Sequence, residues 1–332
     1  MLLKLLRRYE LKALAFLLGM FVIVTAVNPS FMSAESLTNC FNDSVVFTLL
    51  AVGAGFVILT GEIDVSVGSV LGISSAVAAT CLRDGGSLPT AVCLALLIGA
   101  FVGLVNGIGV AVLKIPSLIF TLGTYGVARG AVYVYTGGAW VENLPAWFTG
   151  ASHSYIAGYL TWFYAGVVLL VVIAQILISC THKGRNFIAV GDNINGARLV
   201  GINPTQTKIW AFVLSGVFAS LAGILFTSRI GFITPMSGNS YEMKAIAACV
   251  LGGISLSGGL GTLVGAAIGA VIMTSITRIL VFLGLSSNYD NTITGIILIV
   301  IVVVNTVIQD RAILNSHREI SLKRIAKEAF KE

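Results

Sequence analysis

Residues 45–80 read VVFTLLAVGAGFVILTGEIDVSVGSVLGISSAVAAT, and they indicate the fold class more clearly than any other part of the chain. Two apolar runs, expected at 45–61 and 66–82, flank a short break that carries Glu62 and Asp64. Each run approaches the roughly 20 residues that a helix needs to cross a bilayer. Interrupted helices are tolerated at membrane depth only inside protein or beside water. This segment therefore predicts an integral membrane protein with broken helices.

The composition of the whole chain points to the same class. Of its 332 residues, 57% are hydrophobic and only 10% are charged, whereas soluble domains carry roughly 25% charged residues. This balance argues against a disordered chain, a standard cytosolic enzyme and a protein whose main task is nucleic-acid binding. The five cysteines form no CxxC pair and most lie in apolar runs, so we expect small apolar side chains rather than a metal site or disulfides.

Ten apolar segments have the character of membrane spans. We therefore expect an all-α integral membrane fold of about ten transmembrane helices, some of them broken, in a single domain covering 1–332. The first segment is long for a signal peptide and lacks a small-residue cleavage site, so we expect an uncleaved helix. The spans are expected at 11–27, 45–61, 66–82, 91–113, 117–136, 160–180, 209–228, 243–258, 260–283 and 293–309.

The basic residues test this arrangement, because cytoplasmic loops of membrane proteins are enriched in Lys and Arg. With the N-terminus inside, alternation through ten spans leaves 15 of the 20 Lys and Arg in inside segments. Only Arg83, Arg229 and Lys244 fall outside, and Arg129 and Arg278 fall within spans. We therefore expect both termini in the cytoplasm, together with a mixed-charge tail that covers 311–332.

The inside loop at 181–208 carries a short predicted helix at about 194–200. Asp192 or Asn193 is suited to cap its start, and Gly201 to end it. Its residues are mostly apolar, so we expect it to lie on the bilayer or to dock into a groove of another protein. The chain contains no G-x-x-x-x-G-K-[ST] phosphate-binding motif. Any ATP hydrolysis by a P-loop that drives transport would therefore belong to a separate subunit.

Three motifs occur in order along the chain: GEIDVSVGS at 61–69, the loop motif GDN at 191–193 followed by Gly201, and IAACVLGGIS at 246–255. With these motifs the chain resembles, over essentially its whole length, the permease subunits of ribose-type sugar ABC importers. Within that family it is most similar to the branch that imports the furanosyl signal autoinducer-2.

The resemblance implies a type II-like ABC importer permease that crosses the bacterial inner membrane several times. The implied partners are a second permease chain, like or related, two ABC ATPase subunits below and a periplasmic substrate-binding protein above. This chain would bind no cofactor, since the partner subunits use the ATP. The helix at 194–200 would be the coupling helix seated in an ATPase groove, and the implied contact residues are Gly191, Asp192, Asn193, Ile194, Ala197, Arg198 and Gly201.

Five polar residues in or beside the spans are candidates for the substrate path: Asp64, Ser66, Asn106, Thr124 and Arg129. A charged group at membrane depth is costly, so it should face a wet cavity or a partner. Each residue also has a structural alternative. Asp64 or Ser66 would cap the following helix, Asn106 and Thr124 would join helices, and Arg129 would pair or reach an interface. The sequence leaves both alternatives open.

The outer loop that follows the fifth span carries aromatic residues and lacks Lys and Arg. Trp140 and Glu142 are candidates there for docking an external binding protein. The common alternative for such aromatic residues is an anchor at the membrane interface.

Two function classes besides an ATP-driven importer remain open. An ion-coupled secondary transporter of a small polar solute needs acidic or His groups inside the membrane, and only Asp64 and Glu62 qualify. A membrane-embedded enzyme or scaffold is the other class, although no catalytic constellation is evident in the sequence. The scarcity of charge in the spans predicts a neutral, hydroxylated substrate.

Overall fold

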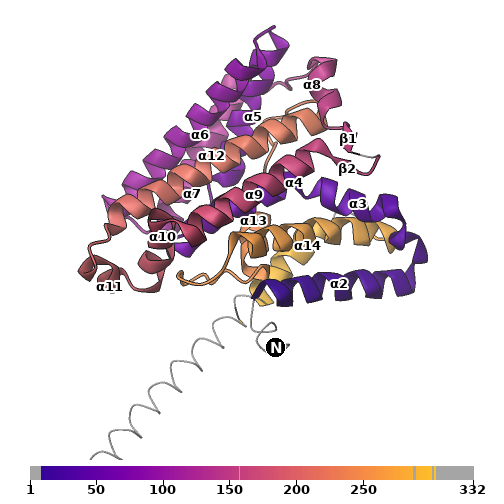
Figure 1. Ribbon diagram of the computed structural model, residues 1–332. Coiled ribbons are helices and arrows are strands. Elements are labelled where there is room, and N and C mark those ends of the chain that lie inside the picture. Colours follow the sequence, from indigo (N-terminus) through magenta and orange to yellow (C-terminus); the bar gives the residue numbers. More distant parts are fainter. Residues whose placement is uncertain (1–8, 157, 287–288, 301–302, 304–332) are drawn as a thin grey trace, which may run out of the picture.

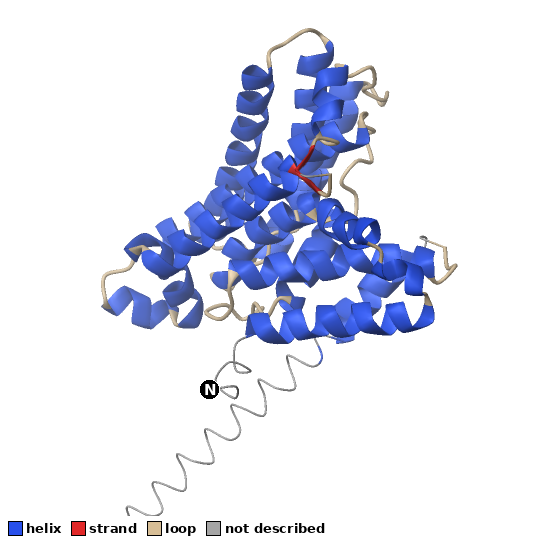
Figure 2. Ribbon diagram, turned by 45° about the vertical axis from the view of Figure 1, so that its right-hand side comes forward, coloured by secondary structure: helices blue, strands red, loops and turns tan. Residues whose placement is uncertain are grey.

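The computed structural model describes residues 9–156, 158–286, 289–300 and 303. The expected tail at 311–332 lies outside these residues. The chain is built from helices, apart from one two-stranded antiparallel hairpin (Figure 2). The elements are α2 (Tyr9–Val27), η1 (Pro29–Met32), α3 (Ala34–Asp43), α4 (Val45–Leu59), α5 (Val67–Arg83), α6 (Leu88–Ala111), α7 (Ser117–Thr136), α8 (Ala146–Ala151), β1 (Tyr155–Ile156), β2 (Leu160–Thr161), α9 (Trp162–Cys180), α10 (His182–Asp192), α11 (Ile194–Leu199), α12 (Pro204–Ile230), α13 (Tyr241–Leu251) and α14 (Leu263–Phe282).

Five of the described helices are long and apolar enough to cross a membrane: α2, α6, α9, α12 and α14. A sixth span arises if α3 and α4, which meet at an angle of 41°, are taken as one broken span. The helix α7 has the same length as α14, 20 residues, but is not among the five. Its Thr, Tyr, Gly and Arg residues lower its hydropathy, which is unusual for a helix that faces only lipid.

The second break is longer than the sequence predicted. We expected spans to 258 and from 260, but α13 ends at Leu251 and α14 begins at Leu263. Gly253, Gly258 and Gly259 in the intervening segment have φ of +90°, +84° and +74°. This left-handed backbone region is open to glycine and strained for other residues, so the glycines end the helix where apolar composition alone would continue it.

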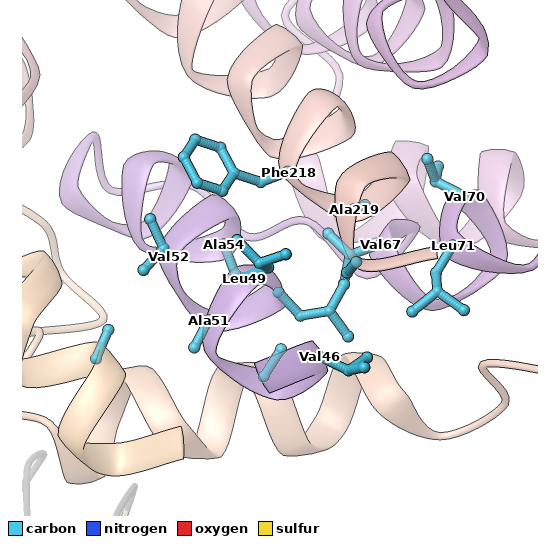
Figure 3. Close-up of a cluster of buried hydrophobic side chains, with 14 of the residues drawn as sticks. Val46, Leu49, Ala51, Val52, Ala54, Val67, Val70, Leu71, Phe218 and Ala219 are labelled. Carbon is cyan, nitrogen blue, oxygen red and sulfur yellow. The ribbon is translucent and has the colours of Figure 1, made fainter. Parts of the chain in front are cut away.

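The core surrounds α4, whose residues are almost all buried. Figure 3 shows side chains of α4, α5 and α12 gathered in one buried cluster, with Leu49, Leu71 and Phe218 among them. On the other side of α12, glycines allow a close crossing with α6. A Cβ atom on Gly99 would lie 2.2 Å from the carbonyl oxygen of Gly216. The small-residue pattern that begins at Gly99 therefore serves helix packing, the usual role of such patterns in membranes.

Ion pairs near the helix ends agree with the alternation of the described helices. Lys208, near the start of α12, pairs with Glu62, after α4, and the expected topology puts both on the inside. At the other end, Asp43 pairs with Arg229 and with Arg278. Arg278 is therefore held by an acidic partner, one of the alternatives for an arginine within a span. Figure 1 shows α10 and α11 at one end of the molecule and α8 with the β-hairpin at the opposite end.

Candidate functional site

The break between α4 and α5 is held by side chains from α7. The backbone N–H of Ile63 donates to Ser117 Oγ at 3.1 Å, and that of Val65 donates to Thr121 Oγ1 at 3.2 Å. These bonds replace helical hydrogen bonds that the chain gives up at Thr60, as non-helical backbone at membrane depth requires. The first turns of α7 therefore fix the conformation of the GEIDVS motif.

Asp64 is the centre of a buried polar cluster, with 2% of its surface exposed. One carboxylate oxygen accepts bonds from the N–H and Oγ of Ser66, at 2.9 and 2.6 Å, and the other accepts from Ser215 Oγ at 2.8 Å. Ser66 Oγ in turn accepts from Asn106 Nδ2 at 2.8 Å. The structure thus brings together three of the candidate path residues and adds Ser215, which the sequence offered only as one serine in an apolar helix.

The capping interpretation of Asp64 needs a correction. Ser66 is the N-cap residue of α5 and makes no capping bond through its side chain. Asp64 binds the N–H of Ser66 itself, so it stabilises the turn into α5 rather than the free N–H groups of the first helical turn. Such local bonds from an Asp side chain to the backbone two residues ahead are a common turn device.

Thr124 and Arg129 do not join this cluster. Thr124 Oγ1 donates to the carbonyl of Thr121 on its own helix. Arg129 Nη1 donates to the carbonyl oxygens of Pro235 and Ser237, at 3.0 and 2.6 Å. Arg129 therefore links the segment before α13 to α7. Its several hydrogen bonds fix the position of its side chain.

Glu242, on the first turn of α13, is a buried polar residue that the sequence did not indicate. Only 5% of its surface is exposed, and its Oε2 has no hydrogen-bond partner within the described part of the chain. It faces α5, where a Cβ on Gly68 would lie 2.1 Å from Oε2. Glu242 lies in the segment YEMKAI, which alternates polar and apolar residues. That pattern is equally compatible with an exposed glutamate, so the sequence did not predict its burial.

The loop between α9 and α12 forms the short helix that the sequence predicted. The side chain of Asn193 caps α11 by accepting from the N–H groups of Asn195 and Gly196, at 3.0 and 2.8 Å. Gly201 follows the helix with φ of +81°. Of the two expected capping residues Asn193 is therefore the cap, whereas Asp192 ends α10.

The two faces of α11 differ in exposure. Ala197 is buried against the rest of the chain, whereas Leu199 and Val200 are 88% and 75% exposed. Ile194 and Gly196 are partly buried, and Arg198 is exposed. The exposed apolar surface at the end of α11 is therefore formed by Leu199 and Val200 rather than by Ala197.

Three chain segments meet beside the ends of α4 and α10, and the third is the connection between α13 and α14. The N–H of Gly259 donates to the carbonyl oxygen of Leu59 at 3.0 Å. A Cβ on Gly191 would lie 2.0 Å from that oxygen, and one on Gly258 would lie 2.6 Å from the nitrogen of Gly61. Side chains have no room here. We call the meeting point of Leu59–Gly61, Gly191–Asp192 and Gly258–Gly259 the glycine junction.

Similarity to known proteins identifies the family of this chain. Residues 36–302 match the model of a family described as the branched-chain amino acid transport system / permease component. The chain belongs to this permease family. The permease is 42% identical to the autoinducer 2 import system permease protein LsrC of Enterobacter sp. (strain 638), over 91% of this chain and 88% of that relative. It is 41% identical to the protein of the same name from Escherichia coli O157:H7, over 93% and 90%. No solved structure matches it significantly.

Membership confirms the resemblance that the three motifs indicated, and it places the permease among transport components rather than enzymes. The matched region contains the Asp64 cluster, the glycine junction and α11. Within the described residues, no group of three or more His, Cys, Asp or Glu side chains could hold a metal ion.

The candidate docking residues of the permease lie on the loop after α7. Trp140 is exposed and stacks on Phe232, with ring centroids 5.4 Å apart. The neighbouring Val141 pairs with Ile233 through two backbone hydrogen bonds. Glu142 is exposed. Trp140 is thus fixed in position by the segment that follows α12, while Glu142 beside it presents a charge to solvent.

Proposed function

We propose that this chain is the transmembrane permease subunit of an ATP-driven ABC importer that moves autoinducer-2, or a related small hydroxylated sugar, across the bacterial inner membrane. The substrate class follows the names of relatives that match about nine-tenths of the chain. The arrangement that fits is a type II-like permease of ten spans with both termini in the cytoplasm.

The glycine junction is the observation that carries this proposal. It joins the loop that carries α11 to the two breaks in the helical core by backbone contacts with no intervening side chains. A displacement of α10 and α11 would therefore act directly on the end of α4 and on Gly258–Gly259 in the connection between α13 and α14. Packed backbones transmit small shifts because interiors are dense and poorly compressible. This is the connection that an importer needs between an external motor and its path.

The motor in this proposal is a pair of ABC ATPase subunits, one below each permease chain. Leu199 and Val200 supply the apolar contact. Two exposed apolar side chains on a rigid capped helix are more stable when buried in a groove of another protein than when exposed to water. Gly191, Asp192, Asn193, Ile194, Ala197, Arg198 and Gly201 set the shape and position of that helix. Ala197 does not contact the ATPase in this proposal. It packs α11 against the rest of this chain.

The substrate path in this proposal follows α7, at the contact with a second permease chain. Gly123, Gly126 and Gly130 on α7 have open space around them. Tyr125 on the same helix donates an exposed hydrogen bond to Asn239 Oδ1 at 2.8 Å. Polar groups at membrane depth should face protein or water rather than lipid. A path between two such faces would offer hydroxyl and amide groups to a neutral sugar, and Thr124 and Arg129 would stand at its wall.

The periplasmic binding protein would deliver the substrate at the opposite end, above the loop with Trp140 and Glu142. The Asp64 cluster lies at the inner end of the path in this scheme and acts as a polar latch between α5, α6 and α12. The serine hydroxyls that bind Asp64 would exchange partners when these helices move.

Uptake into membrane vesicles from cells that express the complete import system tests the proposal. We expect autoinducer-2 or a sugar of a pentose and deoxysugar panel to enter only with ATP, and to enter still when an ionophore collapses ion gradients. Uptake that needs no ATP and stops with the ionophore would instead support an ion-coupled transporter. The control is the same vesicle with an ATPase subunit whose P-loop lysine is replaced.

A further inference from the structure

An apolar groove of about 480 Å³ lies between α9, α10 and α12. It plays no part in the proposed path, which follows α7. Its floor is aromatic and aliphatic, and the main residues are Phe56, Leu170, Ile178, Phe187, Leu214 and Phe218. Phe56 also packs against Phe187 and Phe218, with ring centroids 5.6 and 5.9 Å away. The floor is therefore a fixed part of the core surface.

One end of the groove is polar and basic. Thr181, Asn186 and Gln206 line it there, together with Lys183. Lys183 is exposed and forms no ion pair with a residue in the described ranges. The described lining of the groove includes no Asp or Glu. The charge at this end is thus positive and lacks a partner among the described lining residues.

The length and position of the groove fit one leaflet of a bilayer. Along α9 it runs from Leu170 to Thr181, which is about 16 Å at ~1.5 Å per residue. That is roughly half of the ~30 Å hydrocarbon thickness. The outer surface of α9 beside it is apolar and exposed at Leu169 and Ile176, as expected for a face in contact with lipid. Trp210, 61% exposed, lines the same groove.

We propose that this groove binds an anionic phospholipid of the leaflet on the α10–α11 side. An acyl chain lies on the aromatic floor, and the headgroup phosphate lies at Lys183, where the side-chain amides of Asn186 and Gln206 supply hydrogen-bond donors. A basic pocket between transmembrane helices is a recurrent way of holding an anionic headgroup. The lipid contacts α10, which directly precedes α11. It therefore also stabilises the position of α10 in the loop that carries α11.

Tryptophan fluorescence can test this assignment, because Trp210 lines the groove. The chain has four tryptophans; replacing Trp140, Trp147 and Trp162 by Phe leaves Trp210 as the only reporter. The purified chain is placed in phosphatidylcholine nanodiscs with a small, equal fraction of either brominated phosphatidylglycerol or brominated phosphatidylcholine. Bromine quenches tryptophan on contact.

We expect brominated phosphatidylglycerol to bind in the groove about fivefold better, which is the preference that one Lys adds beside an anionic lipid surface. Lys183→Gln should abolish the preference, and Lys183→Arg should keep it. Arg185→Gln is the matched control, since it removes an exposed charge from the same helix outside the groove. Far-ultraviolet circular dichroism confirms that each variant is folded.

Three results would overturn the assignment. Equal quenching by both lipids in the parent chain would show that the groove does not select a headgroup. Equal loss in Lys183→Gln and Arg185→Gln would indicate a diffuse basic surface. The same measurement on the importer assembled with its partner subunits gives the third result. If neither lipid quenches Trp210 there, a protein partner covers the groove.

Discussion

Replacing Gly191 by Ala introduces one methyl group at the glycine junction. The new Cβ would lie 2.0 Å from the carbonyl oxygen of Leu59 and 2.5 Å from the nitrogen of Gly259. Ordinary contacts to a Cβ begin at 3.4 Å, so α10 must withdraw from α4 by about 1.4 Å. Overpacking of this kind costs about 1–3 kcal/mol. Both obstructing atoms belong to the backbone, so no side chain can turn away to make room.

The matched control is Gly166→Ala on α9, where a Cβ meets nothing within 4 Å. Both glycines are helical, so both substitutions gain up to ~1 kcal/mol of helix propensity. Their difference therefore isolates the steric effect at the junction. We expect Gly191→Ala to lower the free energy of unfolding by about 1–3 kcal/mol relative to Gly166→Ala, as measured by thermal unfolding in detergent.

Transport gives the second readout. Leu199 and Val200 stay exposed in Gly191→Ala, so the ATPase subunits should still co-purify with the variant. Uptake in vesicles should fall because α10 no longer packs on the end of α4 and on Gly259. If Gly191→Ala unfolds at the same temperature as Gly166→Ala and transports like the parent, the junction is neither tight nor part of the coupling.

Leu199→Asp should abolish co-purification of the ATPase subunits while leaving the unfolding temperature unchanged, because the side chain is exposed; retained association would contradict a docking role for this face of α11. Gly126→Phe on α7 should block uptake and preserve folding, whereas Gly166→Phe on α9 should affect neither, since both glycines have open space; equal uptake by the two variants would remove α7 from the path. Ser215→Ala should lower the free energy of unfolding by about 1–3 kcal/mol, because one oxygen of Asp64 loses its donor in a buried site; unchanged thermal unfolding would show that another donor replaces it.

Much of the local structure could be predicted from the sequence because it depends on short-range chemistry. Asn193 and Gly201 delimit α11 by capping and by a left-handed backbone, and both effects act within a few residues. The family could likewise be recognised from three motifs. The second break was predicted at the right place but too short, since the end of α13 depends on how Gly253 and its neighbours pack.

The grouping of the candidate residues could not be predicted. Asp64, Ser66 and Asn106 share one cluster with Ser215, but Thr124 and Arg129 bond elsewhere. Nothing in the local sequence distinguishes Ser215 from other serines in α12. A hydrogen-bond partner on a distant helix is chosen by the rotation and crossing of the helices, which hydropathy does not encode.

Length, hydropathy and charge placement were enough to predict a helical membrane protein. Each helix forms its backbone hydrogen bonds within its own segment, and its residue types reflect whether it lies in lipid or in water. The same information could not reveal that Gly61, Gly191 and Gly258 meet. A glycine in an apolar run has no side chain to mark its role, and its importance lies in the backbone that approaches it. That approach exists only after α4, α10 and α13 have packed together, so only the folded chain shows how the loop that carries α11 contacts the two breaks.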